Sequence, residues 1–156
     1  MAHVTTFPEV EARNLLGTDV ALPQAFEGER NVVLVAFRRN HQDLVDSWLP
    51  WLEQRAANDP QLRFYEIPMI GRIWAPARPF IDGGMASSIK DPVVLARTLT
   101  IYGDLGKVTG PLSIRDRSTI SVFGLERDGS VVWRGTGAYS ADLSAALAAA
   151  LWPTAR

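Results

Sequence analysis

The 156-residue chain contains no cysteine. Disulfide exchange and peroxide reduction by thiols both need a thiolate as the nucleophile, so the sequence excludes thiol-disulfide oxidoreductase and peroxidase activity. A chain of this length can bury roughly two-thirds of its unfolded surface without a disulfide or a metal to hold it together. We therefore expect a single domain over residues 1–156, with no metal and no cofactor.

The sequence also lacks an excess of either charge and any long apolar run. Lys and Arg number 16 against 17 Asp and Glu, and no basic cluster marks a nucleic-acid-binding surface. No stretch approaches the roughly 20 apolar residues of a membrane span. The first ten residues have neither the basic start nor the apolar segment of a signal peptide. We expect a cytoplasmic protein without a membrane span and without a nucleic-acid partner.

What the sequence does contain is a buried strand followed by a helix. The valine-rich run 31–37 predicts a strand that is apolar on both faces. Residues 44–56 repeat apolar side chains at helical spacing, with Pro50 expected to bend the axis. The polar residues 38–43 then lie at the carboxyl end of a strand and the start of a helix, where open α/β sheets bind ligands. We expect Asp43 to cap this helix.

The rest of the chain predicts a sheet flanked by helices. Residues 10–22 alternate around Gly17 and predict a hairpin, followed by a short helical turn at 23–28. Residues 61–67 alternate and predict a parallel strand that Pro68 ends. Later elements are predicted as a helix over 78–90, a helical turn over 92–97, a strand over 98–102, a short helix over 104–110, a hairpin pairing 118–125 with 130–134, and a last helix capped by Ser140.

Phe37 at the strand end, Gln42 and Val45 at the helix start, and Pro50 within the helix resemble the active-site segment of thioredoxin-like proteins of the TlpA and peroxiredoxin type. The resemblance implies an α/β thioredoxin-like fold, with a central mixed sheet, flanking helices and the N-terminal hairpin as an extension. It places Gln42 and Val45 where those proteins carry their two cysteines, and Ile120 near their cis-proline. Both parts of the redox site are therefore replaced.

A second, looser similarity links the chain to the mitochondrial ATP synthase assembly factor family, which has a thioredoxin-like fold. It rests on Asp46-Ser-Trp48, on residues 97–102 and on the closing Val-Val-Trp133-Arg-Gly-Thr-Gly137. The motifs are short, so the similarity adds support for the fold only.

His41 is the candidate catalytic residue, because a histidine at a helix start can serve as acid, base or ligand donor. The alternative is an exposed turn residue in the place of a tryptophan common in thioredoxins. Too few ligands surround it for a metal site. Nor does the sequence contain a phosphate loop, a nucleophile elbow or a metalloprotease motif.

The remaining candidates form a ligand-binding set and a partner-binding set. Arginine side chains beside a helix start could clamp a carboxylate or phosphate, or could pair with Asp43, Asp46 or Asp116. The ligand-binding set is Arg38, Arg39, His41, Gln42, Asp43 and Arg115. Residues 68–77 are unusually apolar for a loop and could either pack over the sheet or bind a partner. The partner-binding set is Met69, Ile73 and Trp74.

Two functions follow from these observations. The first is a redox-inactive binding or assembly protein that uses the degenerate active-site cleft and the 68–77 loop. The second is a thiol-independent enzyme that acts on a small anionic substrate with His41 as acid or base. The expected partner is thus a protein or a small anionic ligand, and a homodimer is compatible with the sequence.

Overall fold

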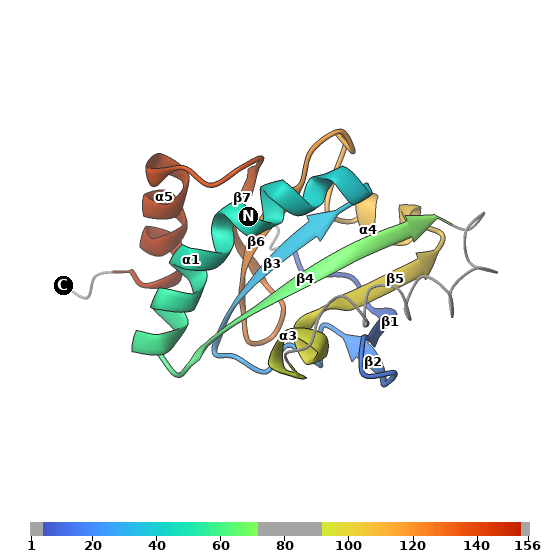
Figure 1. Cartoon of the computed structure of the whole chain (residues 1–156), viewed down its shortest axis with the longest axis horizontal. Helices are drawn as coiled ribbons and strands as arrows, with labels where there is room; N and C mark the ends of the chain where they lie inside the picture. The colour runs from blue at the N-terminus through green and yellow to red at the C-terminus, as the bar shows by residue number, and fades with distance from the viewer. Residues whose placement is uncertain (1–4, 72–91, 154–156) are drawn as a thin grey trace.

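The computed structural model describes residues 5–71 and 92–153. Its seven strands form one sheet in the order β2-β1-β5-β4-β3-β6-β7 (Figure 1). The three central strands run parallel: β3 (Arg30–Ala36), β4 (Leu62–Gly71) and β5 (Leu99–Gly103). Antiparallel pairs flank them: β1 (Val10–Asn14) with β2 (Asp19–Leu22), and β6 (Ser121–Glu126) with β7 (Val131–Thr136). The predicted mixed α/β sheet with an N-terminal hairpin is confirmed.

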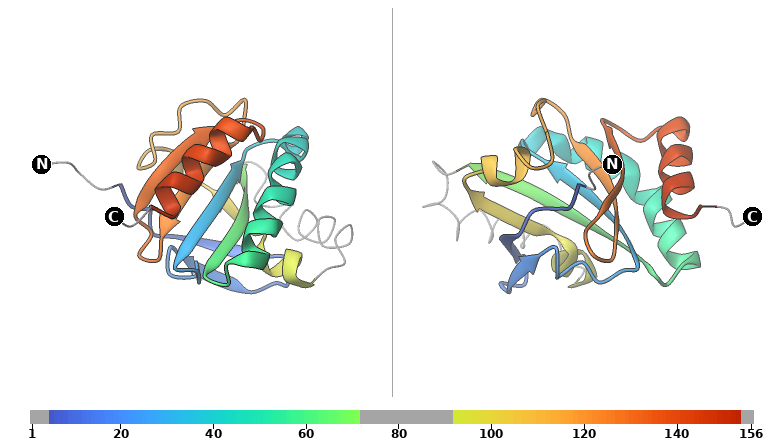
Figure 2. Two further views of the ribbon diagram at one scale, coloured as in Figure 1. Left: turned by 90° about the vertical axis from the view of Figure 1, so that its left-hand side faces the viewer. Right: turned by 180° about the vertical axis from the view of Figure 1, so that it is seen from behind.

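Helices cover both faces of this sheet (Figures 1 and 2). The long helix α1 (Gln42–Asn58) and the last helix α5 (Ala141–Leu151) pack on one face, over a core that includes Val45, Leu52 and Leu147. The short helix α4 (Gly106–Thr109) lies on the opposite face, where Val108 enters the second core cluster. A further short helix, α3 (Pro92–Arg97), contacts β1 and β4. The helix expected over 78–90 lies outside the described residues.

Strand β3 is buried on both sides, as its apolar sequence predicts. Val33 and Val35 face the cluster around α4, while Val32 and Leu34 face α1 and α5. All four side chains are 0% exposed. Strand β3 pairs with β4 on one edge and with β6 on the other, so its position in the sheet is fixed. Since α1 begins only a few residues after β3 ends, the start of α1 is positioned by this strand.

Three local predictions are wrong. Strand β4 does not end at Pro68 but continues to Gly71. Pairing with β3 ends at Pro68 and pairing with β5 begins at Met69, so the proline, which lacks an N–H, falls at the change of partner. Asp43 does not cap α1, because a 3₁₀ turn η1 (Arg39–His41) precedes the helix and its N-cap residue is His41. Residues 23–25 form a single hydrogen-bonded turn, and residues 26–28 are not helical.

Aromatic side chains attach the middle of α1 to the chain between β7 and α5. Trp48 is fully buried and donates its Nε1–H to the Gly137 carbonyl at 3.0 Å. Its ring also meets Tyr139 edge-on, with the two centroids 5.4 Å apart. The Ser47 hydroxyl accepts the Tyr139 N–H at 2.9 Å. These contacts hold α1 at the Pro50 region, where the helix has lost a backbone hydrogen bond.

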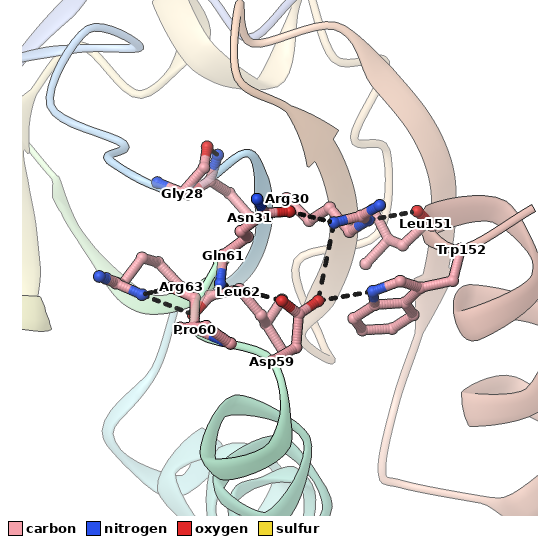
Figure 3. Close-up of polar contacts among 10 residues, drawn as sticks. All are labelled: Gly28, Arg30, Asn31, Asp59, Pro60, Gln61, Leu62, Arg63, Leu151 and Trp152. Carbon is pink, nitrogen blue, oxygen red and sulfur yellow. Dashed lines mark hydrogen bonds and ion pairs between the residues drawn. The ribbon is translucent and has the colours of Figure 1, made fainter.

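A polar network lies at the end of the sheet where β3 begins (Figure 3). Arg30 donates its Nε–H to the Leu151 carbonyl at 2.7 Å and lies 3.7 Å from the Asp59 carboxylate. Trp152 donates its Nε1–H to the same carboxylate at 2.6 Å. The network therefore joins the start of β3 to the last residues of α1 and α5. We call Arg30, Asp59 and Trp152 the clamp.

Candidate functional site

The loop between β3 and α1 meets the chain segment that leads into β6. The Arg117 guanidinium lies over the Phe37 ring, 5.8 Å from its centroid, and donates to the Thr109 hydroxyl at 3.2 Å. Asp116 accepts the Ser118 hydroxyl and N–H, and these bonds, with the charge of Arg38, hold the pKa of Asp116 below its usual value. Residues 37–41 and 115–118 thus form one surface, which we call the loop site.

His41 is buried, which contradicts the alternative of an exposed turn residue. Its side chain is 2% exposed, and Nδ1 accepts the Phe37 N–H at 3.1 Å. This bond assigns the neutral tautomer that carries its proton on Nε2. Nε2 has no hydrogen-bond partner among the described residues. Held in this way, His41 can donate a hydrogen bond from Nε2, whereas Nδ1 already accepts the Phe37 N–H and is not available as a base.

The two arginines of the loop are exposed. Neither Arg38 nor Arg39 forms an ion pair with the acidic residues proposed above, Asp43, Asp46 or Asp116, within the described part of the chain. Arg115 is also exposed. The loop site therefore presents exposed arginine side chains that form no ion pair with Asp43, Asp46 or Asp116 in the described part of the chain, although the charge of Arg38 acts on Asp116.

The positions that the thioredoxin-like resemblance assigns to redox residues hold side chains without redox chemistry. Gln42 is the first residue of α1 and is exposed, while Val45 lies one turn further on and is fully buried. Ile120, also fully buried, directly precedes β6. The strand, the turn and the helix start are all present without a sulfur atom at their junction.

Solved structures with this arrangement are numerous: 176 chains match. A thioredoxin domain of a thiol-disulfide oxidoreductase from Bacteroides vulgatus matches with a TM-score of 0.61 at 15% identity, covering 97% of this chain and 99% of that one. The exposed lipoprotein thioredoxin Etrx1 from Streptococcus pneumoniae matches with a TM-score of 0.60 at 11% identity, covering 88% and 96%. The chain has a thioredoxin-like fold.

A third match is BsSco, a member of the Sco family of cytochrome c oxidase assembly proteins, with a TM-score of 0.59 at 12% identity over 95% of this chain and 94% of that one. No family model matches the sequence, and no curated protein matches it. The similarity to the ATP synthase assembly factor family is not shown by these comparisons and stays a prediction. No helix in residues 5–71 and 92–153 has the length and apolar character to cross a membrane.

One polar residue of the thioredoxin-like fold escaped the sequence-based selection. Glu66 lies on β4, on the same face as Leu62 and Phe64, beneath the first turns of α1. Burial, followed by the nearby charge of Asp46, raises the pKa of Glu66 to about 7, although Gln42 and Arg97 act in the opposite direction. The sequence did contain a sign of this residue: in the alternating pattern of β4, Glu66 falls on the face where the two preceding positions are the apolar Leu62 and Phe64.

Of the partner-binding set, Met69 alone lies within the described residues. Met69 is 3% exposed and belongs to the core cluster on the α4 face, because residues 68–71 continue β4 within the sheet. It cannot contact a partner in this position. Ile73 and Trp74 lie outside the described residues.

A cavity of about 570 Å³ lies at the other end of the sheet, beside the clamp. Its charged lining includes Arg30 and Arg127. Arg30 already binds Leu151 and Asp59, and Arg127 pairs with Glu29 at 2.8 Å. Since both arginines are engaged within the chain, we place the candidate site at the loop site and not in this cavity.

Proposed function

We propose that the chain is a redox-inactive thioredoxin-fold binding protein that captures a protein partner through the loop site. One observation carries this proposal: a complete strand, turn and helix of a thioredoxin-like fold contain no cysteine, and the resemblance assigns Gln42 and Val45 to the places of a reactive cysteine pair. Without a thiol, what remains of such a site is its shape and its charge.

The charge of the loop site suggests what the partner presents. Arg38, Arg39 and Arg115 are exposed, and guanidinium groups bind carboxylates with two parallel hydrogen bonds. An acidic segment of a protein partner fits this surface. Assembly is one context for such binding, because the Sco family that BsSco represents assembles cytochrome c oxidase.

The second candidate is an enzyme acting on a small anionic substrate at the same arginines. The buried Nε2–H of His41, unpaired among the described residues, favours His41 as a hydrogen-bond donor to such a substrate. The hydrogen bond from Phe37 to Nδ1 counts against any mechanism in which His41 abstracts a proton. This candidate is therefore restricted to reactions in which the neutral His41 side chain donates a hydrogen bond to the substrate.

The binding proposal is tested by partner capture with the immobilised full chain from lysate of the source cells. Replacing Arg38→Ala and Arg39→Ala together should weaken capture by about tenfold or more, since a hydrogen bond to a charged group contributes about 1.5–3 kcal/mol. The matched control is Lys107→Ala with Arg127→Ala, which removes two exposed positive charges elsewhere. Equal capture by the two double variants would contradict the proposal.

The enzyme candidate is separated by thermal shift with a panel of small carboxylates and phosphates. A ligand at 100 times its Kd stabilises the native state by about 2.7 kcal/mol, or roughly 5–10 °C for a chain of this size. A shift that is lost in the Arg38/Arg39 variant would favour the enzyme. An absence of shifts together with a captured protein would favour the binding protein.

A further inference from the structure

Strand β7 is the last strand of the sheet beyond β6, and its outer edge is only partly covered. At its start the Val131 N–H donates to the Thr5 carbonyl at 2.7 Å. Next to this bond, Thr6 forms an antiparallel bridge with Ser130. The chain therefore already lays one extended segment against the first part of this edge. No described strand pairs with the second half of β7 on that side.

The register of β7 with β6 determines which backbone groups point away from the sheet. The Gly137 N–H donates to the Ile120 carbonyl at 3.1 Å, so these residues are a hydrogen-bonded pair of the antiparallel ladder. Such pairs alternate with pairs whose N–H and C=O groups point away from the partner strand. In β7 the second kind falls at Arg134 and Thr136. We call the outward backbone groups of these two residues the open edge.

The open edge has few of the features that prevent pairing with another strand. Among the described residues, none outside the ladder is hydrogen-bonded to the backbone of Arg134 or Thr136, and both residues are exposed. Strand β7 contains neither proline nor lysine, which proteins commonly place on exposed edges. Its irregularity of register lies opposite Gly124 and Leu125, nearer its start. The open edge can therefore hydrogen-bond an added strand.

The charge beside the open edge is positive. Arg134 is the one charged residue of β7, and its guanidinium lies over the Phe123 ring, 5.2 Å from the centroid. It also donates to the Ser113 carbonyl at 3.3 Å, so the open edge lies beside the segment that leads to Arg115 and the loop site. An added strand therefore meets cations from both β7 and the loop site, which favours acidic side chains.

We propose that the open edge binds an extended acidic segment of the protein partner as an added antiparallel strand, with a carboxylate opposite Arg134. The backbone groups of Arg134 and Thr136 hold the segment, and the arginine side chain selects its charge. The antiparallel direction is that of both present neighbours of β7, which are β6 and the bridge at Thr6. This inference rests on the proposed function, because the segment belongs to the partner that the loop site captures.

A second copy of the chain fits the open edge less well. Two β7 strands paired antiparallel through Arg134 and Thr136 of both copies put the two Arg134 side chains at diagonal positions on one face of the joined sheet. Like charges at such positions repel each other. A carboxylate of a partner in the same place is attracted instead, so we assign the open edge to a partner segment.

The test uses a blocked synthetic peptide of alternating glutamate and threonine, titrated into the ¹⁵N-labelled full chain. In an antiparallel pair, the residues opposite Arg134 and Thr136 direct their own N–H groups toward β7. With glutamates at these places, N-methylation of the glutamate amides should weaken binding by about tenfold or more, whereas N-methylation of the threonine amides should not. The amides of Arg134 and Thr136 should exchange their hydrogens about tenfold more slowly in the complex. These measurements use the wild-type chain.

Two variants separate the backbone from the charge. Thr136→Pro removes an outward N–H without removing a bond of the β6–β7 ladder, and should weaken peptide binding by about threefold to tenfold. Ala21→Pro is the matched control on the opposite edge, where the register of β2 with β1 turns the Ala21 N–H outward. It should leave binding unchanged. Arg134→Ala should weaken binding of the acidic peptide by about twofold to fivefold.

Three results would overturn the inference. The first is no binding of the peptide at millimolar concentration, and the second is equal binding of the two methylated peptides. The third is a dimer in sedimentation velocity that Thr136→Pro dissociates, which would assign the open edge to a second copy. Failure of the proposed function is a separate result. If Arg38→Ala with Arg39→Ala weakens partner capture but Thr136→Pro does not, the proposed function stands and the added strand is wrong.

Discussion

Replacing Glu66→Gln should stabilise the protein at high pH and leave it nearly unchanged at low pH. Glutamine has the shape of the protonated side chain but cannot ionise. The pKa of Glu66 is raised from 4.5 to about 7 in the folded state, so the folded chain holds a proton that the unfolded chain has released. Stability from this group is fully present below pH 4.5 and is lost as the pH rises through about 7.

The magnitude follows from the shift. The difference between 4.5 and about 7 is 2.5 pH units, and each unit corresponds to about 1.36 kcal/mol, which gives about 3 kcal/mol as the upper limit. Some of this is already lost at pH 5, and the half-buried side chain keeps part of its hydration. We therefore expect the free energy of unfolding of the wild type to fall by roughly 2 kcal/mol between pH 5 and pH 8 on account of Glu66.

Urea unfolding at pH 5, 6, 7 and 8 measures this difference. Glu66→Gln and the control Glu11→Gln change the net charge equally, so their difference isolates the buried carboxyl. The gap between the two free energies should open from near zero at pH 5 to roughly 2 kcal/mol at pH 8, with unchanged m-values. A gap that is constant with pH would refute the argument that burial and Asp46 act on Glu66.

Three further predictions concern the end of the sheet that carries the clamp. Trp152→Phe keeps an aromatic ring near Arg30 but removes the donor to Asp59, and should lower the free energy of unfolding by about 1–2 kcal/mol in urea. Burial opposes ionisation of Asp59, but hydrogen bonds from Gln61 and Trp152 and the charge of Arg30 outweigh it and lower the pKa. Asp59 therefore contributes stability that is lost as the pH falls, and Asp59→Asn should flatten the acid limb of the stability profile below pH 4. Asn31→Ala should cost about 2–4 kcal/mol in thermal or urea unfolding, because the buried amide both accepts from the Gly28 N–H and donates to the Gly28 carbonyl, and a loss below about 1 kcal/mol would contradict this.

The sequence predicts the scaffold well because its strongest patterns are local. The valine run of β3, the helical spacing after it, and Asp128-Gly129 between two apolar segments each indicate one element without knowledge of its neighbours. The prediction that Pro68 ends the strand is wrong because the effect of a proline depends on where the neighbouring strands pair. The positions of strand pairing are a property of the assembled sheet and cannot be seen in a local pattern.

The candidate site was less predictable, since it depends on contacts between distant segments. His41 follows three exposed polar residues in the sequence, and its burial arises from the way the loop folds back so that Phe37 donates to it. The position of Glu66 in the strand pattern marked it as unusual, but its proximity to Asp46 and Arg97 requires β4, α1 and α3 to be assembled. Arg38 and Arg39 could be assigned to the loop, whereas the absence of an ion pair to Asp43, Asp46 or Asp116 within the described residues could not.

The clamp lies at the amino end of β3, while the loop site lies at its carboxyl end. The groups that fasten the ends of α1 and α5 to the sheet are thus separated from the groups available for binding by the full length of a buried strand. The hydrogen bonds and the ion pair of the clamp involve neither Gln42 nor the arginines of the loop site. The residues of the loop site can therefore change their chemistry while the clamp continues to hold α1 and α5 to the sheet.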